Sequence, residues 1–159
     1  MNSDEIADIS TLRCLFLPLR EYNLIIPYSS VDEILPFAVV ENDDAEGFIV
    51  GKLLWRRDTI PLVSFEVLNN QEKPEIRRRT RAAVMHVNTE NTATAIQNFA
   101  IILSGMPKML VISDADLLEV DEEHLPNCTS REVEVNGEKA YIPDFDALEY
   151  ILHKKYKNQ

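Results

Sequence analysis

Apolar residues along this chain fall into short runs separated by polar turns. Residues 12–19 have the sequence LRCLFLPL and residues 22–27 the sequence YNLIIP, with Arg20 and Glu21 between them. Short runs rich in Leu, Ile and aromatic residues, bounded by a polar turn, are typical of hairpin strands. The pattern therefore predicts that the chain begins with two antiparallel strands. The following segment, 29–35, fits either a capped helical turn or a third strand.

Further apolar runs predict more strands in the middle of the chain. Pro61 interrupts one of them, which predicts an edge strand or a bulge because proline cannot donate to the ladder. A polar connector over residues 69–80 predicts a boundary between two halves of the chain. The predicted strands cover residues 48–55, 59–65, 81–87, 95–103 and 108–112.

The end of the chain carries the clearest local signals. Asn136-Gly137 separates two alternating segments, 131–135 and 138–142, and predicts a hairpin closed by a type I′ turn. Asp144 is a favourable N-cap for a terminal helix. The expected apolar face of this helix consists of Phe145, Leu148, Ile151 and Leu152.

Eight or more short strands and few helices predict an all-β fold made of barrels or a sandwich. With 159 residues, the chain suits one domain, or two very small units sharing a core. We expect residues 1–10 to form a flexible acidic leader and residues 11–159 a single domain.

The charge balance argues against several kinds of partner. The chain has 16 basic and 27 acidic residues, a net charge of −11, which opposes binding to nucleic acid and to anionic membranes. The basic run Lys73, Arg77–Arg79 and Arg81 is interpreted as a solvated loop or a docking patch for an acidic protein. No apolar run approaches the length of a spanning helix, and no secretory signal is recognised. We expect a cytoplasmic protein in which Cys14 and Cys128 are reduced thiols.

Catalytic and metal-binding patterns are absent from the sequence. His86, His124 and His153 have no metal-ligand spacing, although His124 beside Glu122 and Glu123 is a conceivable weak site. CxxC, phosphate-loop and GxSxG motifs are missing. The sequence therefore predicts no enzyme, no cofactor and no metal. The alternative is a small β-barrel protein, either ligand-binding or an enzyme subunit, with a polar pocket.

Four collinear segments of the chain form a pattern when taken together: FLPLREYNLIIPYSSVDEIL, GKLLWRRDTIPLVSF, IQNFAIILSGMPKMLVIS and REVEVNGEKAYIPDFDALEYIL. This pattern resembles the CheW-like domain, the adaptor of bacterial chemosensory systems. The resemblance extends from about residue 12 to residue 152. The matching positions in the first two segments are Tyr22, Val31, Glu33, Ile34, Gly51, Arg56, Pro61, Leu62 and Val63.

Four positions depart from the family pattern. Leu54 replaces a usual Asn, Arg57 a Gly, Ser64 an Asp, and Ser104 the Asp before Gly105. These departures suggest a divergent branch, and the short acidic format looks like the ChpC or PilI adaptors of type IV pilus (twitching) systems.

The resemblance implies two interleaved, five-stranded SH3-like β-barrels that share a hydrophobic core, plus a short C-terminal helix. It implies a non-catalytic adaptor, peripheral to membrane receptor arrays. Such an adaptor couples the cytoplasmic tip of a methyl-accepting chemoreceptor to the regulatory domain of a CheA-type histidine kinase. By position, Val31 and Glu33 would line the receptor groove with Ile34 behind them. The other implied groove residues are Arg56, Arg57, Gly105 and Met106.

Overall fold

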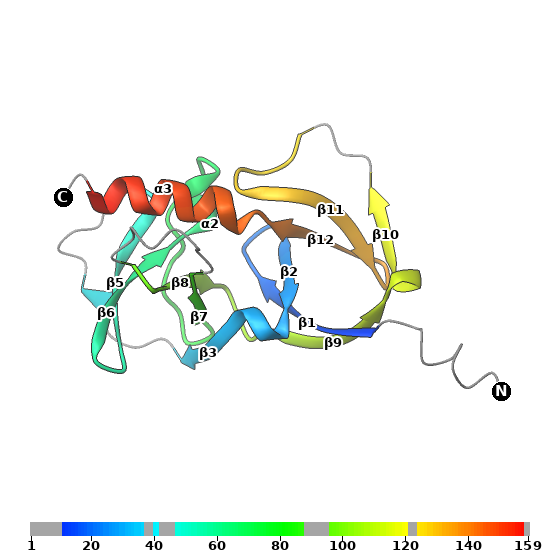
Figure 1. Cartoon of the computed structure of the whole chain (residues 1–159), viewed down its shortest axis with the longest axis horizontal. Helices are drawn as coiled ribbons and strands as arrows, with labels where there is room; N and C mark the ends of the chain where they lie inside the picture. The colour runs from blue at the N-terminus through cyan, green and yellow to red at the C-terminus, as the bar shows by residue number, and fades with distance from the viewer. Residues whose placement is uncertain (1–10, 37–39, 42–46, 88–95, 121–123, 158–159) are drawn as a thin grey trace.

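The fold consists of two curled β-sheets side by side, with a helix lying across one of them (Figure 1). The computed structural model describes residues 11–36, 40–41, 47–87, 96–120 and 124–157. The expected leader over residues 1–10 lies outside these described residues.

The first sheet has six strands among the described residues, in the order β10-β11-β12-β2-β1-β9. All pairs are antiparallel except β12 with β2. The strands are β1 (Thr11–Pro18), β2 (Asn23–Pro27), β9 (Lys108–Ser113), β10 (Leu117–Val120), β11 (Thr129–Val135) and β12 (Glu138–Pro143).

The second sheet also has six strands in the described part of the chain, in the order β3-β7-β8-β6-β5-β4. Only β6 with β8 is parallel. The strands are β3 (Val31–Pro36), β4 (Val40–Glu41), β5 (Ile49–Trp55), β6 (Asp58–Val63), β7 (Arg81–His86) and β8 (Asn98–Leu103).

Four short helical elements complete the described fold. A 3₁₀ turn η1 (Tyr28–Ser30) joins the two sheets, and η2 (Asp114–Asp116) joins β9 to β10. Helix α2 (Phe65–Leu68) follows β6, and α3 (Phe145–Lys157) follows β12. Segment 29–35 is therefore a short turn followed by a strand.

Three apolar clusters account for the packing. One fills each sheet's concave face, and the largest lies between the sheets and under α3. Leu148 and Leu152 of α3 are buried in this shared core, and Phe145 and Ile151 pack against it, as the apolar face predicted. Each fully buried leucine contributes about 2 kcal/mol from removal of its surface from water.

The predicted fold class is confirmed: the chain is mostly β, with a shared core and a C-terminal helix. Each sheet gains a short outer strand, β10 or β4, which the sequence pattern did not predict. The Asn136-Gly137 turn is also confirmed, because φ is +52° and +82° at the two positions. Asp144 caps α3 by accepting a hydrogen bond from the Ala147 N–H at 3.1 Å.

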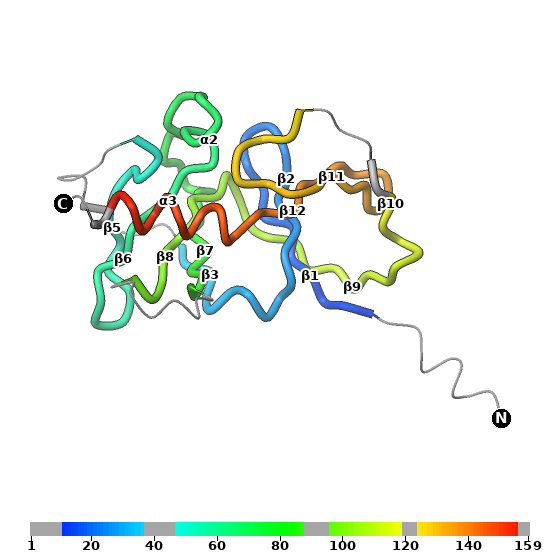
Figure 2. Tube along the Cα trace, turned by 45° about the horizontal axis from the view of Figure 1, so that its top comes forward, coloured from blue at the N-terminus to red at the C-terminus, as the bar shows by residue number. Residues whose placement is uncertain are grey.

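The boundary predicted at residues 69–80 is wrong. The connector joins α2 to β7, and β6 and β7 belong to the same sheet. The actual division separates the contiguous segment β3 to β8 from the strands that precede and follow it (Figure 2).

Candidate functional site

Strand β3 carries three of the predicted groove residues and begins with a β-bulge. Val31 pairs with Met85, but Glu33 pairs with Val84, so Asp32 is an extra residue on β3. Such a bulge changes which side chains share a face.

The bulge places Val31 and Ile34 on one face and Glu33 on the other. Val31 and Ile34 are half-buried and pack against the shared core, whereas Glu33 is exposed and faces the cluster of the second sheet. Val31 and Glu33, which the family resemblance implies for the same groove, therefore lie on opposite faces of β3.

The side chain of Asp32 holds the bulge in place. Its Oδ1 lies 3.0 Å from Nδ1 of His86, and its Oδ2 accepts a hydrogen bond from Nδ2 of Asn98 at 2.8 Å. His86 and Asn98 are paired on β7 and β8. Asp32 therefore ties the start of β3 to the next two strands, and His86 has a structural partner.

Trp55 connects Glu33 to the predicted arginine. The indole Nε1–H donates to Glu33 Oε1 at 3.0 Å, and the guanidinium carbon of Arg56 lies 4.3 Å from the centroid of the Trp55 ring. Since β3 and β5 are not neighbours in the sheet, this contact also shows that the sheet curls on itself. The sequence singled out Arg56 but missed the adjacent Trp55, the only tryptophan in the chain.

Arg56 and Arg57 form the two-residue loop of the β5–β6 hairpin. Trp55 pairs with Asp58, and both arginines are exposed. Arg56 has φ of +56°, a conformation that costs a non-glycine residue about 1 kcal/mol. The exposed guanidinium stacks on the indole at this end of the hairpin.

The structure does not bring Gly105 and Met106 together with Val31. These two residues follow Leu103, which pairs with Arg81 at one end of β7, whereas Val31 pairs with Met85 near the other end. Gly105 lies beside the β1–β2 turn, where an added Cβ would be 3.9 Å from Pro18 Cγ. Met106 is 67% exposed.

Apolar side chains that are exposed or half-buried lie on elements next to the junction of the two sheets. Met109 and Val111 on the outer strand β9 are 53% and 63% exposed, and Tyr28 of η1 is 47% exposed. Met109 pairs with Leu15, a member of the shared core that Val31 also contacts. We call Tyr28, Val31, Met109 and Val111 the seam strip.

The sequence analysis did not select Met109, Val111 or Tyr28. The only signal was that β9 is apolar at successive positions, so both faces of the strand carry hydrophobic side chains. Its inward residue Ile112 is buried in the first sheet's cluster, which leaves Met109 and Val111 facing solvent.

The described residues show no activated nucleophile and no cluster of three or more metal-ligand side chains. Burial raises the pKa of the Cys14 thiol, and burial followed by the charge of Asp144 raises the pKa of Cys128. Both changes favour the protonated thiol rather than the reactive thiolate. Cys14, buried in the first sheet's cluster, is a core residue.

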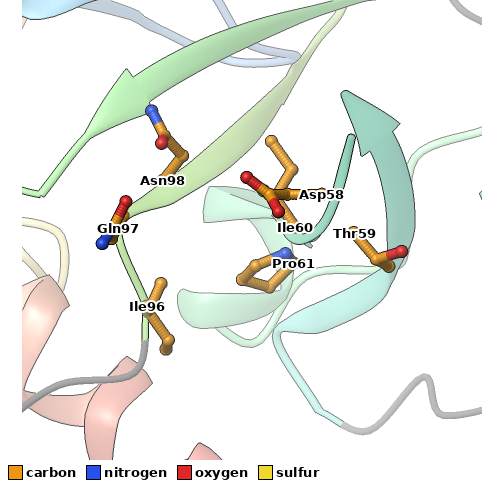
Figure 3. Close-up of a pocket in the computed structure, with 7 residues that line it drawn as sticks. All are labelled: Asp58, Thr59, Ile60, Pro61, Ile96, Gln97 and Asn98. Atoms are coloured by element: carbon orange, nitrogen blue, oxygen red, sulfur yellow. The ribbon is translucent and has the colours of Figure 1, made fainter. Parts of the chain in front are cut away.

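A hollow of about 290 Å³ lies where β6 and β8 have not yet begun to pair (Figure 3). Their parallel ladder begins at Leu62, so Pro61 lies beside this gap. The sequence expected an edge strand or a bulge at Pro61, but β6 is an inner strand and its register shift falls elsewhere, opposite residues 49–51 of β5. The hollow is lined by Asp58, Thr59, Ile60, Pro61, Ile96, Gln97 and Asn98.

The structure accounts for two of the four departures from the family pattern. Ser64 caps α2, accepting from the Val67 N–H at 3.1 Å, which is also a role that aspartate performs well. Ser104 donates its hydroxyl to the Pro18 carbonyl at 3.2 Å and joins the two sheets. Leu54 is 69% exposed on β5, and nothing in the structure explains it.

Comparison with known proteins agrees with this architecture. Residues 13–150 match the family described as the CheW-like domain. The fold is similar to the crystal structure of the scaffolding protein TtCheW from Thermoanaerobacter tengcongensis, with a TM-score of 0.67, 12% sequence identity and 84% of each chain covered. No curated protein sequence matches the chain significantly. In the part of the chain that the structure describes, no helix is both long and apolar enough to span a membrane.

Proposed function

The chain belongs to the CheW-like domain family, and on that premise we propose that it is a non-catalytic adaptor of a bacterial chemosensory system. Its proposed partners are the cytoplasmic tip of a methyl-accepting chemoreceptor and the regulatory domain of a CheA-type histidine kinase. Because these partners are cytoplasmic, we expect the chain in the cytoplasm at the periphery of receptor arrays.

The observation that carries the proposal is the seam strip. Tyr28, Met109 and Val111 are exposed, and Val31 packs against the shared core. Exposed apolar side chains of this size support a protein interaction site. A receptor tip is a helical hairpin, and a helix binds such a surface through apolar residues at helical spacing. The strip therefore supports a receptor contact between the two sheets.

We propose that Arg56, on the side of β3 that carries Glu33, adds a polar contact to the receptor. Its guanidinium is stacked on Trp55, and it is exposed at the tip of the hairpin. A planar guanidinium binds a carboxylate through two parallel hydrogen bonds, which fixes orientation as well as register. We propose that Arg56 binds an acidic side chain or helix-end carbonyls of the receptor, with Arg57 adding charge beside it.

The adaptor would transmit a signal by binding two receptor states with different affinity. A protein can shift a conformational equilibrium only by the difference between its affinities for the two states. Individual contacts can be weak, because an array engages many copies at once and raises the effective concentration.

Isothermal titration of the chain with a receptor tip fragment and with the kinase regulatory domain tests the proposal. We expect saturable binding to both, and Arg56→Glu should weaken receptor binding about tenfold with unchanged circular dichroism. Lys154→Glu on α3 is the matched control, since it changes the charge equally at another exposed site. Absence of binding to several receptors, or unchanged affinity of the Arg56 variant, would overturn the assignment.

The pathway served is a finer part of the proposal. The departures at Leu54 and Arg57 alter the surface of the β5–β6 hairpin, which supports a branch with its own receptors, and we propose the type IV pilus (twitching) system. Titration with receptor tip fragments from a twitching system and a flagellar system should give tighter binding to the former. Equal or tighter binding to the flagellar receptor tip would contradict this part.

A further inference from the structure

A basic turn lies between α2 and β7, and the proposed adaptor contacts leave it unused. Five cationic residues fall within nine positions of a chain whose net charge is −11. The turn precedes Arg81, which lies at the opposite end of β7 from the partner of Val31, so it is separate from the seam strip. These residues are Lys73, Arg77, Arg78, Arg79 and Arg81.

Hydrogen bonds fix the shape of this turn. The Arg77 N–H donates to the Thr80 hydroxyl oxygen at 2.8 Å, and the Thr80 N–H donates to the Arg77 carbonyl at 3.0 Å. Thr80 is 3% exposed and anchors the turn in the fold. Arg81 donates from Nη1 to the carbonyls of Arg78 and Thr80 at 2.9 and 3.0 Å. The backbone around Arg78 and Arg79 is therefore ordered before any ligand arrives, which lowers the entropic cost of binding.

The turn forms one wall of an open hollow of about 710 Å³. The lining also includes Arg20 of the β1–β2 turn, whose guanidinium donates to the Glu72 carbonyl at 3.0 Å. The described residues that line the hollow are Arg20, Glu66, Glu72, Lys73, Pro74, Glu75, Arg77, Arg78, Arg79, Thr80, Leu103 and Ser104.

Cations outnumber carboxylates in this lining, and two of the three carboxylates already have partners. Glu75 pairs with Arg77 at 2.9 Å. Glu66 is 3% exposed and accepts hydrogen bonds from the Ser64 hydroxyl and the Arg20 N–H, both at 3.1 Å. By contrast, Lys73, Arg78 and Arg79 make no ion pair with any residue that the structure describes.

We propose that the basic turn and its hollow bind an acidic polypeptide segment, rich in Asp and Glu, of a partner protein. The charges are complementary, and the size of the hollow suits several side chains rather than a single small anion. Among the residues that the structure describes, no aromatic side chain lines the hollow to stack a base, and a strongly acidic chain repels the rest of a long nucleic acid. A short acidic segment meets neither obstacle.

Fluorescence anisotropy tests the proposal with a labelled peptide of about ten residues, mostly Glu, and a matched peptide in which Gln replaces every Glu. We expect the Glu peptide to bind and to weaken with added salt, because exposed ion pairs are screened over a Debye length of about 10 Å at 0.1 M. The double variant Arg78→Gln/Arg79→Gln should weaken binding about tenfold, since each exposed ion pair changes an equilibrium constant by up to about fivefold.

Two controls separate this site from net charge and from the proposed adaptor surface. Lys154→Glu changes the net charge by the same amount as the double variant and should leave peptide affinity unchanged. Arg56→Glu, which tests receptor binding, should also leave it unchanged, so failure of one proposal does not imply failure of the other.

Three results would overturn the inference. The first is equal binding of the Gln peptide, or no binding of the Glu peptide at low salt. The second is unchanged affinity in the double variant. The third is evidence for a different partner. Either a labelled single-stranded oligonucleotide of equal charge binds as tightly as the peptide, or the protein self-associates in a salt-dependent way that the double variant removes.

Discussion

Asn69 joins the two sheets, and its substitution provides a quantitative test of the packing between them. It follows α2, and its Nδ2 donates to the Tyr22 hydroxyl at 3.2 Å and to the Phe65 carbonyl at 2.9 Å. Its Oδ1 accepts from the Asn127 N–H at 2.6 Å. One side chain therefore holds the second sheet's helix to a strand turn and a loop of the first.

We expect Asn69→Ala to destabilise the protein by about 2 to 3 kcal/mol. Each hydrogen bond contributes about 1 kcal/mol net, and the groups left without a partner are only partly shielded from water. Since native domains are stable by only about 5–15 kcal/mol, this change shifts the urea midpoint clearly.

Urea unfolding followed by circular dichroism measures the effect, with Asn69→Asp as the matched variant. Aspartate keeps the oxygen that accepts from Asn127, but it sets a charged oxygen against the Phe65 carbonyl where the amide donated, so it should lose at least as much stability as alanine. If Asn69→Ala changes the free energy of unfolding by less than about 0.5 kcal/mol, solvent replaces these bonds and the reasoning fails.

Two further predictions concern stability. Gly137→Ala should lower the free energy of unfolding by about 1 kcal/mol, measured in urea, because φ is +82° and no atom blocks the added Cβ. Gly105→Ala, where φ is not positive, should lower it much less. Equal losses in the two variants would contradict the backbone argument. Burial, and then the charge of Glu66, raise the pKa of the Tyr22 phenol above its ordinary 10.0. The stability that the protonated Tyr22 phenol contributes is therefore fully present below about pH 10, and it is lost as the pH rises through the raised pKa. Tyr22→Phe should show a shallower fall in urea titrations above this pH, and an identical slope in both proteins would refute the assignment.

Signals that lie within a few residues of one another were predictable from the sequence. The Asn136-Gly137 turn and the Asp144 cap need only local backbone preferences, and both occur as predicted. The apolar face of α3 follows from helical periodicity, and its members pack on the shared core. The collinear motifs identified the family, which the match over residues 13–150 confirms.

Features that depend on distant partners were not predictable in this way. The bulge at Asp32 is set by His86 and Asn98, more than fifty residues later in the chain, so the sequence could not show that Val31 and Glu33 lie on opposite faces of β3. The strands β6 and β7, which precede and follow the polar connector, belong to the same sheet because both pair with β8. The groove roles assigned to Val31, Glu33, Ile34, Arg56, Arg57, Gly105 and Met106 stay predictions.

The interleaved topology has a consequence for how the chain acquires its fold. Every strand from β3 to β8 is contiguous in sequence, so the second sheet can pair as soon as it leaves the ribosome. The first sheet cannot, because Phe16 must wait for Lys108 and Asn23 for Ala140. Closing so long a loop is entropically costly and is compensated only by contacts already in place. The hairpin of β1 and β2 therefore emerges first but completes its sheet last. By then the second sheet is formed and offers its side of the shared core for packing.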